Sequence, residues 1–93
     1  MTISEIKQII INTIKGYPIK SIILFGSRAD GTNRTDSDVD LIVEFSAPVT
    51  LLTLTGLQLE LEEALSLDVD IVHGPLQSTD LIEINKKIVL YSA

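Results

Sequence analysis

The chain has no cysteine and a single histidine among its 93 residues. The absence of cysteine excludes disulfide bonds and thiolate metal sites, and a lone histidine, His73, excludes a site built from several imidazoles. A bound metal ion would therefore have to be held by carboxylate oxygens. Such ligands favour hard cations such as Mg²⁺.

Basic residues are scarce, because 7 Lys and Arg stand against 13 Asp and Glu. The net charge of −6 argues against duplex DNA or RNA as a partner, since proteins that bind duplexes carry basic patches. No apolar run approaches the length of about 20 residues that spans a bilayer, and the polar N-terminus does not resemble a signal peptide. We therefore expect no membrane association and a cytoplasmic location.

Apolar sequence is sufficient for one core, because 45% of the residues are hydrophobic and 22% are charged. This balance is typical of a globular protein rather than a disordered one. The length fits a single domain, and no internal repeat or linker divides the chain. We therefore expect residues 1–93 to form one domain.

Helical and strand patterns alternate along the chain. Isoleucines at helical spacing predict a helix over residues 3–14, and Thr2 and Glu5 are spaced as a capping box at its start. Apolar and β-branched runs predict three strands, at residues 19–25, 39–45 and 69–73. Helices are predicted at 50–66 and 78–87, and residues 88–91 either end the last helix or form a short strand.

The segment 50–66 is the longest helical stretch and is apolar on more than one side. Its core face is predicted to consist of Leu54, Leu57, Leu61 and Leu65. Leu52 and Leu59 lie well away from that face. Two explanations remain open: a neighbouring loop covers them, or another chain does, so that this helix mediates a homo- or hetero-oligomer.

The order of these elements predicts how the strands are arranged. A strand, a helix and a strand in succession usually form a right-handed parallel unit. Strands 39–45 and 69–73 should therefore lie side by side, with their N-terminal ends at one edge of the sheet. The modest length of the loop between strands 19–25 and 39–45 is compatible with an antiparallel arrangement of the two, which would bring the C-terminal end of 19–25 to the same edge.

Small and acidic residues converge at that edge. Gly26 and Ser27 follow the first strand, Asp38 and Asp40 begin the second, and Asp70 begins the third. Because Asp38 and Asp40 are two residues apart, an extended chain points both to the same face. The sequence therefore predicts three carboxylates beside a Gly-Ser turn.

Such a cluster suits metal-dependent phosphate chemistry. Close carboxylates raise each other's pKa unless a cation neutralises them. Two Mg²⁺ ions about 3.5–4 Å apart can clamp a triphosphate for in-line displacement. Asp38 and Asp40 would bridge the ions, and Asp70 would hold the one that activates the attacking hydroxyl and accept its proton. Gly26 allows close approach of a phosphate, and Ser27 offers an O–H and an N–H donor.

Simpler roles compete with these. Asp38 and Asp40 could belong to a solvated turn, Ser27 could be a turn residue, and Arg28 could be a solvated loop cation. The conjunction of a Gly-Ser turn with two spaced carboxylates favours the functional interpretation.

The third carboxylate also has a competitor. Asp68 lies two residues before Asp70 and could face the site instead. We favour Asp70 because Val69 and Ile71 flank it within an apolar run. His73, at the end of the same run, is expected to be a surface or packing residue.

These residues together resemble a known superfamily. The pattern consists of Gly26-Ser27, Ser37-Asp38-Val39-Asp40-Leu41 and Val69-Asp70-Ile71-Val72. It is similar to the nucleotidyltransferases with a DNA polymerase β-like palm. The short chain resembles their minimal members, the MNT-type antitoxins that act beside HEPN-domain toxins. The resemblance implies an α/β (α+β) fold, with a small mixed sheet flanked by helices in the order α-β-β-α-β-α.

The resemblance also implies an activity, the transfer of AMP from ATP to a tyrosine hydroxyl on a partner HEPN toxin, with release of pyrophosphate. It implies two Mg²⁺ ions, with Asp38, Asp40 and Asp70 as metal-binding and catalytic residues. The nucleotide-binding residues that we predict are Gly26, Ser27, Arg28 and Ser37.

The chain departs from the family pattern at Asp30, where many members have arginine. The candidates to replace that cation are Arg28 and Arg34. Because the three carboxylates are intact, we expect an active enzyme. Two alternatives remain: an inactive palm that neutralises a toxin by binding it, and a subunit of a small-molecule nucleotidyltransferase of the antibiotic-modifying type.

Overall fold

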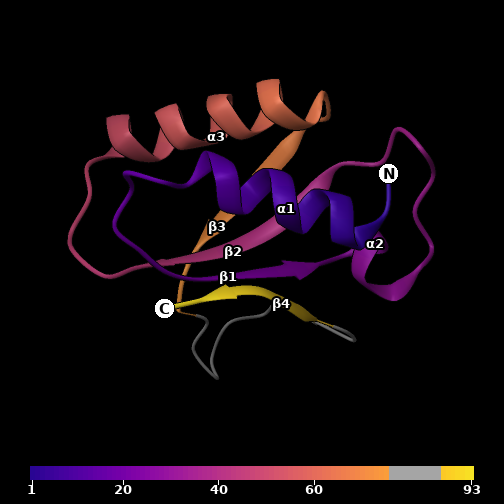
Figure 1. Ribbon diagram of the computed structural model, residues 1–93, viewed down its shortest axis with the longest axis horizontal. Coiled ribbons are helices and arrows are strands. Elements are labelled where there is room, and N and C mark those ends of the chain that lie inside the picture. Colours follow the sequence, from indigo (N-terminus) through magenta and orange to yellow (C-terminus); the bar gives the residue numbers. More distant parts are fainter. Residues whose placement is uncertain (76–86) are drawn as a thin grey trace.

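The computed structural model describes residues 1–75 and 87–93 of the chain. Helices and strands alternate along it (Figure 1). Their bounds are α1 (Ile3–Thr13), β1 (Ile19–Phe25), α2 (Ser27–Asp30), β2 (Val39–Phe45), α3 (Leu51–Leu65), β3 (Val69–His73) and β4 (Ile88–Ser92). The bounds predicted for the first three long strands are confirmed, and the two long helices begin and end within one residue of the prediction.

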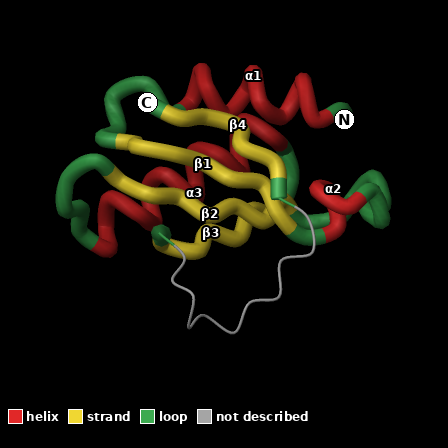
Figure 2. The backbone as a smooth tube through the Cα atoms, turned by 90° about the horizontal axis from the view of Figure 1, so that it is seen from below, coloured by secondary structure: helices red, strands yellow, loops and turns green. Residues whose placement is uncertain are grey.

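The strands form one mixed sheet in the order β3-β2-β1-β4 (Figure 2). β2 is parallel to β3, as the sequence predicts, and antiparallel to β1, the arrangement with which the length of the connecting loop is compatible. β4 extends the sheet beyond β1 as an antiparallel edge strand. The C-terminal residues therefore form a strand, which decides between the two alternatives for 88–91. The helix predicted over 78–87 lies, up to residue 86, outside the described residues.

The first helix is stabilised at its start by a reciprocal cap. The Thr2 backbone N–H donates to the Glu5 carboxylate at 2.9 Å, and the Glu5 N–H donates to Thr2 Oγ1 at 3.1 Å. This capping box satisfies N–H groups that have no partner within a helix. Ile6 and Ile10 are buried on the core face of α1, whereas Ile3 in the first turn is 38% exposed. The cap and the apolar stripe together fix where α1 begins and which side it buries.

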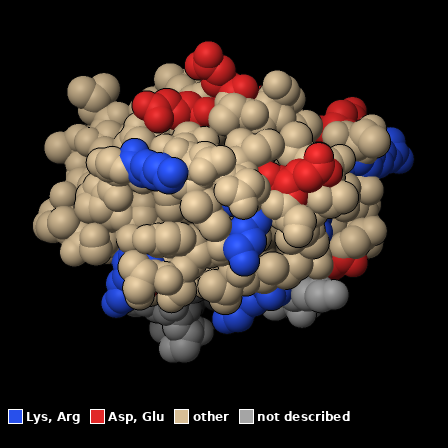
Figure 3. Space-filling view, viewed as in Figure 1, with Lys and Arg blue, Asp and Glu red and all other residues tan. Residues whose placement is uncertain are grey.

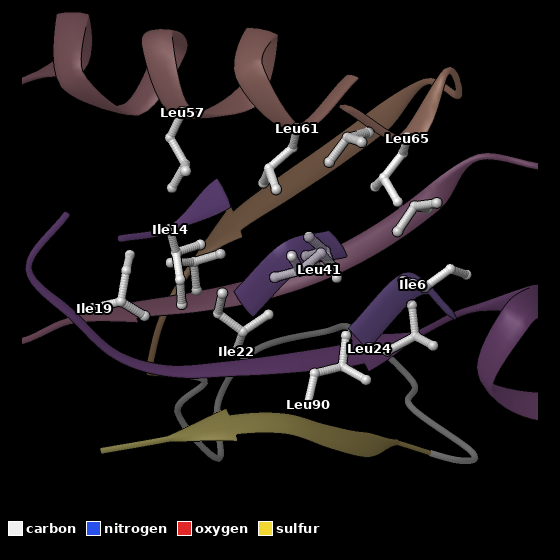
Figure 4. Close-up of a cluster of buried hydrophobic side chains, with 14 of the residues drawn as sticks. Ile6, Ile14, Ile19, Ile22, Leu24, Leu41, Leu57, Leu61, Leu65 and Leu90 are labelled. Atoms are coloured by element: carbon white, nitrogen blue, oxygen red, sulfur yellow. The ribbon is translucent and has the colours of Figure 1, made fainter. Parts of the chain in front are cut away.

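The core lies between α1, α3 and one face of the sheet (Figure 4). Three leucines of α3 point toward the sheet, namely Leu57, Leu61 and Leu65. Each is at most 2% exposed, and full burial of such a side chain contributes about 1.5–3 kcal/mol. Leu54, predicted on the same face, is half-buried. The prediction of the core face of α3 is confirmed for its three buried leucines.

Both long helices cover the same face of the sheet, and the acidic residues of β2 and β3 lie on the other face. Val39, Leu41 and Val43 of β2 are buried in the core cluster with the helices. Because side chains alternate along a strand, Asp40 points to the opposite face. The same alternation in β3 buries Val69 and turns Asp70 away from the helices. The predicted carboxylates therefore share the face that α1 and α3 do not cover.

The outer side of α3 is apolar at its N-terminal end. Leu51, Leu52 and Leu59 are 78%, 81% and 60% exposed. Figure 3 shows no charged atoms at the N-terminal end of α3, whereas acidic side chains gather farther along it. No neighbouring loop in the described part of the chain covers Leu52 or Leu59. For the described residues, the explanation that a loop covers these two leucines is therefore wrong.

Candidate active site

Three chain segments meet at one end of the sheet. Phe25, the last residue of β1, pairs with Asp40 of β2, and Asp40 pairs with Asp70 of β3. The turn that begins at Gly26 therefore starts beside Asp40, and α2 lies at the same end of the sheet (Figure 2). The convergence predicted from the strand order is present.

Gly26 is in direct contact with the carboxylate of Asp40. Its backbone has φ 77° and ψ −157°, a conformation that is essentially restricted to glycine. A Cβ atom added to Gly26 would collide with a carboxylate oxygen of Asp40 and lie 3.1 Å from its Cγ. Glycine is thus required twice at this position, by the backbone and by the space that the carboxylate occupies.

Asp40 is the electrostatic centre of the site. Burial raises the pKa of its carboxyl above the ordinary value, and the neighbouring charges of Asp70 and then Asp38 raise it further. A hydrogen bond with Asp70 acts in the same direction. The three predicted carboxylates therefore interact, although they come from two strands and from the loop before β2.

The donor set fits a hard divalent cation. All three side chains offer carboxylate oxygens, and the raised pKa of Asp40 marks negative charge that a cation would neutralise. Within residues 1–75 and 87–93, no group of three or more His, Cys, Asp or Glu side chains is arranged so that it could hold a metal ion. The chemistry of the carboxylate oxygens, and not a preformed cage, is therefore what fits the cation.

Asp68 lies apart from this cluster. It lines a separate depression of about 350 Å³ together with Asp36 and Glu62. Its backbone carbonyl accepts a hydrogen bond from Val39 N–H at 2.8 Å, which ties the starts of β2 and β3 together. Asp70, rather than Asp68, therefore approaches Asp40, as the sequence favours.

Ser27 is the first residue of the short helix α2. The carbonyl of Gly26 accepts from Ala29 N–H at 3.0 Å and from Asp30 N–H at 3.1 Å, so the turn is closed by backbone hydrogen bonds. The N–H groups of the first residues of a helix have no partner within it. Ser27 is half-buried and directly follows Gly26, the residue that contacts Asp40.

Arg28 is buried, which the sequence does not predict. Its side chain is 4% exposed and donates three hydrogen bonds to backbone carbonyls of the loop before β2. Nε and Nη2 donate to the Ser37 carbonyl at 3.1 and 2.9 Å, and Nη2 donates to the Thr35 carbonyl at 3.2 Å. Ser37 is also engaged in the loop, since its Oγ accepts from Arg34 N–H at 2.8 Å. Arg28 and Ser37, two of the four residues predicted to bind the nucleotide, thus form hydrogen bonds with the loop before β2.

Asp30, the departure from the family pattern, belongs to the turn that ends α2. Its carboxylate accepts from Thr32 N–H at 3.0 Å and from Thr32 Oγ1 at 2.6 Å. Side chains of this type commonly stabilise turns in this way. Arg34, one of the two candidates for a replacement cation, is exposed in the same loop.

A larger hollow lies at the opposite end of β2, away from the carboxylates. It measures about 930 Å³ and is lined by Phe45 and His73, whose rings are stacked with centroids 5.4 Å apart. Lys20 and Glu44, also in its lining, form an ion pair at 3.0 Å. His73 therefore has a packing role, as predicted, and the hollow contains none of the predicted site residues.

The sequence matches the polymerase β nucleotidyltransferases over residues 7–93, nearly its whole length. The chain belongs to this nucleotidyltransferase family. The mixed sheet with helices on one face and carboxylates on the other is its fold. Among residues 1–75 and 87–93 of this nucleotidyltransferase, no helix is long and apolar enough to cross a membrane.

Curated relatives of this nucleotidyltransferase include archaeal proteins. One from Methanocaldococcus jannaschii, assigned as a protein adenylyltransferase, is 40% identical over 72 residues, which are 77% of each chain. The protein adenylyltransferase MntA of Thermococcus cleftensis is 36% identical over 76 residues, again 77% of each chain.

Solved structures give the same fold. A chain in the crystal structure of a toxin–antitoxin complex with AMP-PNP has a TM-score of 0.77 and 27% identity, over 94% of this chain and 73% of that one. A minimal nucleotidyltransferase has a TM-score of 0.65 and 34% identity, over 78% of each chain.

Proposed function

We propose that this nucleotidyltransferase transfers AMP from ATP, in a metal-dependent reaction, to a tyrosine hydroxyl on a HEPN-domain toxin and thereby acts as an antitoxin. The observation that carries the proposal is the meeting of Asp38, Asp40 and Asp70 with the Gly26 turn at one end of the sheet. The assignment of relatives as protein adenylyltransferases supports a protein acceptor.

The roles of the residues follow from their positions. Asp38 and Asp40 would hold two Mg²⁺ ions and Asp70 would share one of them. The ions, when bound, would neutralise charge on the triphosphate and activate the acceptor hydroxyl. At Gly26 the space that a Cβ would take is filled by the Asp40 carboxylate. The absence of a side chain would let a phosphate approach the Gly26 backbone, and Ser27 would offer hydrogen-bond donors to it.

The reaction is an in-line displacement at the α-phosphorus of ATP. The acceptor oxygen forms a bond to that phosphorus, the bond to the bridging oxygen of the β-phosphate breaks, and pyrophosphate leaves. The proton of the acceptor hydroxyl passes to Asp70, which is exposed at the edge of the cluster and can meet an incoming group. The product is a phosphodiester between AMP and the acceptor.

The acceptor is proposed to come from another protein. A toxin–antitoxin complex with AMP-PNP contains a chain of this fold. Another toxin–antitoxin complex, with a chain 25% identical to this one, carries two Asp→Glu substitutions two residues apart, the spacing of Asp38 and Asp40. The net charge of −6 also suits a protein surface better than an RNA end. A cytoplasmic location, where ATP and a toxin are both available, belongs to the same proposal.

The direct test is transfer of label. The purified protein is incubated with ATP labelled at the α-phosphate, Mg²⁺ and the HEPN-domain toxin proposed as its partner, and the toxin is analysed by mass spectrometry. We expect a mass increase of one or more AMP groups on a tyrosine of the toxin, dependent on Mg²⁺. The absence of label, under conditions in which an active relative modifies its own toxin, would refute transfer.

A second function, neutralisation by binding alone, is favoured by the exposure of Leu52 and Leu59 on α3, which would give a partner an apolar contact. Co-expression of the toxin with the Asp38→Asn, Asp40→Asn double variant separates the two functions. Loss of protection supports transfer of AMP. Retained protection, with the variant still bound to the toxin, supports a binding module.

A further inference from the structure

Arg28 has an environment that is unusual for an arginine near a phosphate site. Among the residues that the structure describes it is the one buried charged residue, at 4% exposure. Its guanidinium contacts no carboxylate within ion-pairing distance in that part of the chain, where the one ion pair is between Lys20 and Glu44. Burying a charge is costly unless hydrogen bonds compensate it, and here backbone carbonyls do so.

The carbonyls that Arg28 contacts belong to the segment that delivers the metal-binding residues. Ser37, which accepts two of its three hydrogen bonds, directly precedes Asp38. Arg28 itself directly follows the Gly26-Ser27 turn. A single side chain therefore joins the turn that would bind phosphate to the loop that ends at the first carboxylate.

The effect of Arg28 that the hydrogen bonds show is geometric. A fork of N–H donors on two carbonyls fixes the direction of the backbone at Ser37, and hence the course of the chain into Asp38 and β2.

We propose that Arg28 is a positioning residue, which holds the loop before β2 so that Asp38 and Asp40 are presented together to the metal ions, and that it is not a nucleotide ligand. The metal and nucleotide roles in this statement rest on the proposed function. The contact of Arg28 with the loop does not depend on them, and it can be tested separately.

The test uses Arg28→Lys. This variant keeps the positive charge but lacks the planar guanidinium that donates to the Ser37 and Thr35 carbonyls together. We expect the Mg²⁺ concentration needed for half-maximal transfer to rise about 10- to 100-fold, the range typical of lost support for metal ligands. The KM for ATP at saturating Mg²⁺ should stay near that of the wild type. Amide hydrogen exchange of metal-free protein should be faster at Ser37, whose N–H donates to the Arg34 carbonyl at 3.1 Å.

Arg34→Lys is the matched control. Arg34 lies in the same loop, but its side chain is exposed. The same change of arginine to lysine should therefore leave both the amide exchange at Ser37 and the Mg²⁺ requirement as in the wild type. An equal effect of the two substitutions would overturn the proposal, since it would trace to a loss of arginine in the loop and not to the buried fork.

A nucleotide-ligand role gives the opposite pattern. If Arg28→Lys raised the KM for ATP and left the Mg²⁺ requirement and the exchange at Ser37 unchanged, the proposal would be wrong. Unchanged values in all three measurements would overturn it as well.

Nuclear magnetic resonance of the wild-type protein provides a test that needs neither activity nor a foldable variant. The Nε–H of Arg28 should exchange slowly with solvent compared with that of Arg34, and should keep its resonance position when AMP-PNP and Mg²⁺ are added. Fast exchange, or a shift caused by the nucleotide, would overturn the proposal. If the wild type transfers no AMP while this Nε–H is protected, the proposed function fails and the loop contact stands.

Discussion

Asp40 and Asp70 are direct partners across the parallel strands β2 and β3. Two carboxylates in this register repel each other. Burial, and after it this repulsion, raises the pKa of Asp40. Like charges opposite each other in a sheet weaken it. The site is therefore a place where the fold gives up stability, and a bound cation would restore it.

Replacement of Asp40 should separate stability from activity. We expect Asp40→Asn to abolish AMP transfer and to raise the Tm of the metal-free protein, by up to about 4 °C for a domain of this size. The amide carries no charge and can donate a hydrogen bond to Asp70. Calorimetry in the presence of a chelator measures the Tm. Asp36→Asn, at an exposed loop position, is the control and should leave the Tm unchanged. A lower Tm for Asp40→Asn would contradict the prediction.

The same pair of proteins should show a defined pH dependence. Because the pKa of Asp40 is raised in the folded state, its favourable contribution is present below the ordinary pKa of aspartate, about 3.9, and is lost as the pH rises through the raised value. The Tm difference between Asp40→Asn and the wild type should thus be smallest near pH 3 and largest near neutral pH, without metal. Thermal unfolding followed by circular dichroism across this range checks the trend, and a difference that does not vary with pH would count against it.

Gly26 should tolerate no side chain. Gly26→Ala is expected to destabilise the protein by about 1–3 kcal/mol from its backbone conformation alone, and to displace the Asp40 carboxylate and so abolish transfer. Gly31→Ala is the matched control, because Gly31 also has a positive φ, of 84°, but an added Cβ would meet nothing within 4 Å. It should cost about 1–2 kcal/mol and preserve activity. Urea unfolding and the transfer assay distinguish them, and equal activities would disprove the steric argument.

Two neighbouring aspartates of the β3 region should differ in function. Asp70→Asn is expected to lower the transfer rate by about 10²- to 10⁴-fold, the range typical of lost acid–base residues, because Asp70 lies opposite Asp40. Asp68→Asn should keep nearly full activity, since the Asp68 side chain lines a separate depression and its backbone makes the contact to Val39. The rates of AMP transfer by the two variants, measured at saturating Mg²⁺, test this difference. A severe loss in Asp68→Asn alone would reverse the assignment of the third carboxylate.

The exposed leucines of α3 should matter for partner binding and not for folding. The Leu52→Gln, Leu59→Gln double variant is expected to change the free energy of unfolding by no more than about 0.5 kcal/mol per site, because both side chains are exposed. Leu57→Ala, in the core of the same helix, should cost about 2–5 kcal/mol. If the toxin covers this surface, calorimetric titration with the toxin will show weaker binding by the double variant. Unchanged affinity would place the contact elsewhere.

Local patterns in the sequence were sufficient for α1, α3 and the first three strands, whereas residues 88–91 stayed open between a helix end and a strand. The bounds of β1, β2 and β3 follow from apolar runs that end at turn residues, and the start of α1 follows from Thr2 and Glu5. The Gly26-Ser27 turn and the spacing of Asp38 and Asp40 are equally local. Their pattern resembles that of the nucleotidyltransferase family. Neighbouring residues alone set backbone propensity, capping and side-chain alternation, so these features need no tertiary contact.

Contacts between distant residues were decided only by the tertiary structure. The register of β2 against β3 put Asp70, and not Asp68, opposite Asp40, and the placement of both helices on one face left the carboxylates on the other. The burial of Arg28 arose in the same way. Arginine is rarely buried, and its fork found carbonyls that only the folded loop brings within 3.2 Å. The sequence thus determined which groups the site contains, whereas their pairing depended on strand register and packing, which no local pattern encodes.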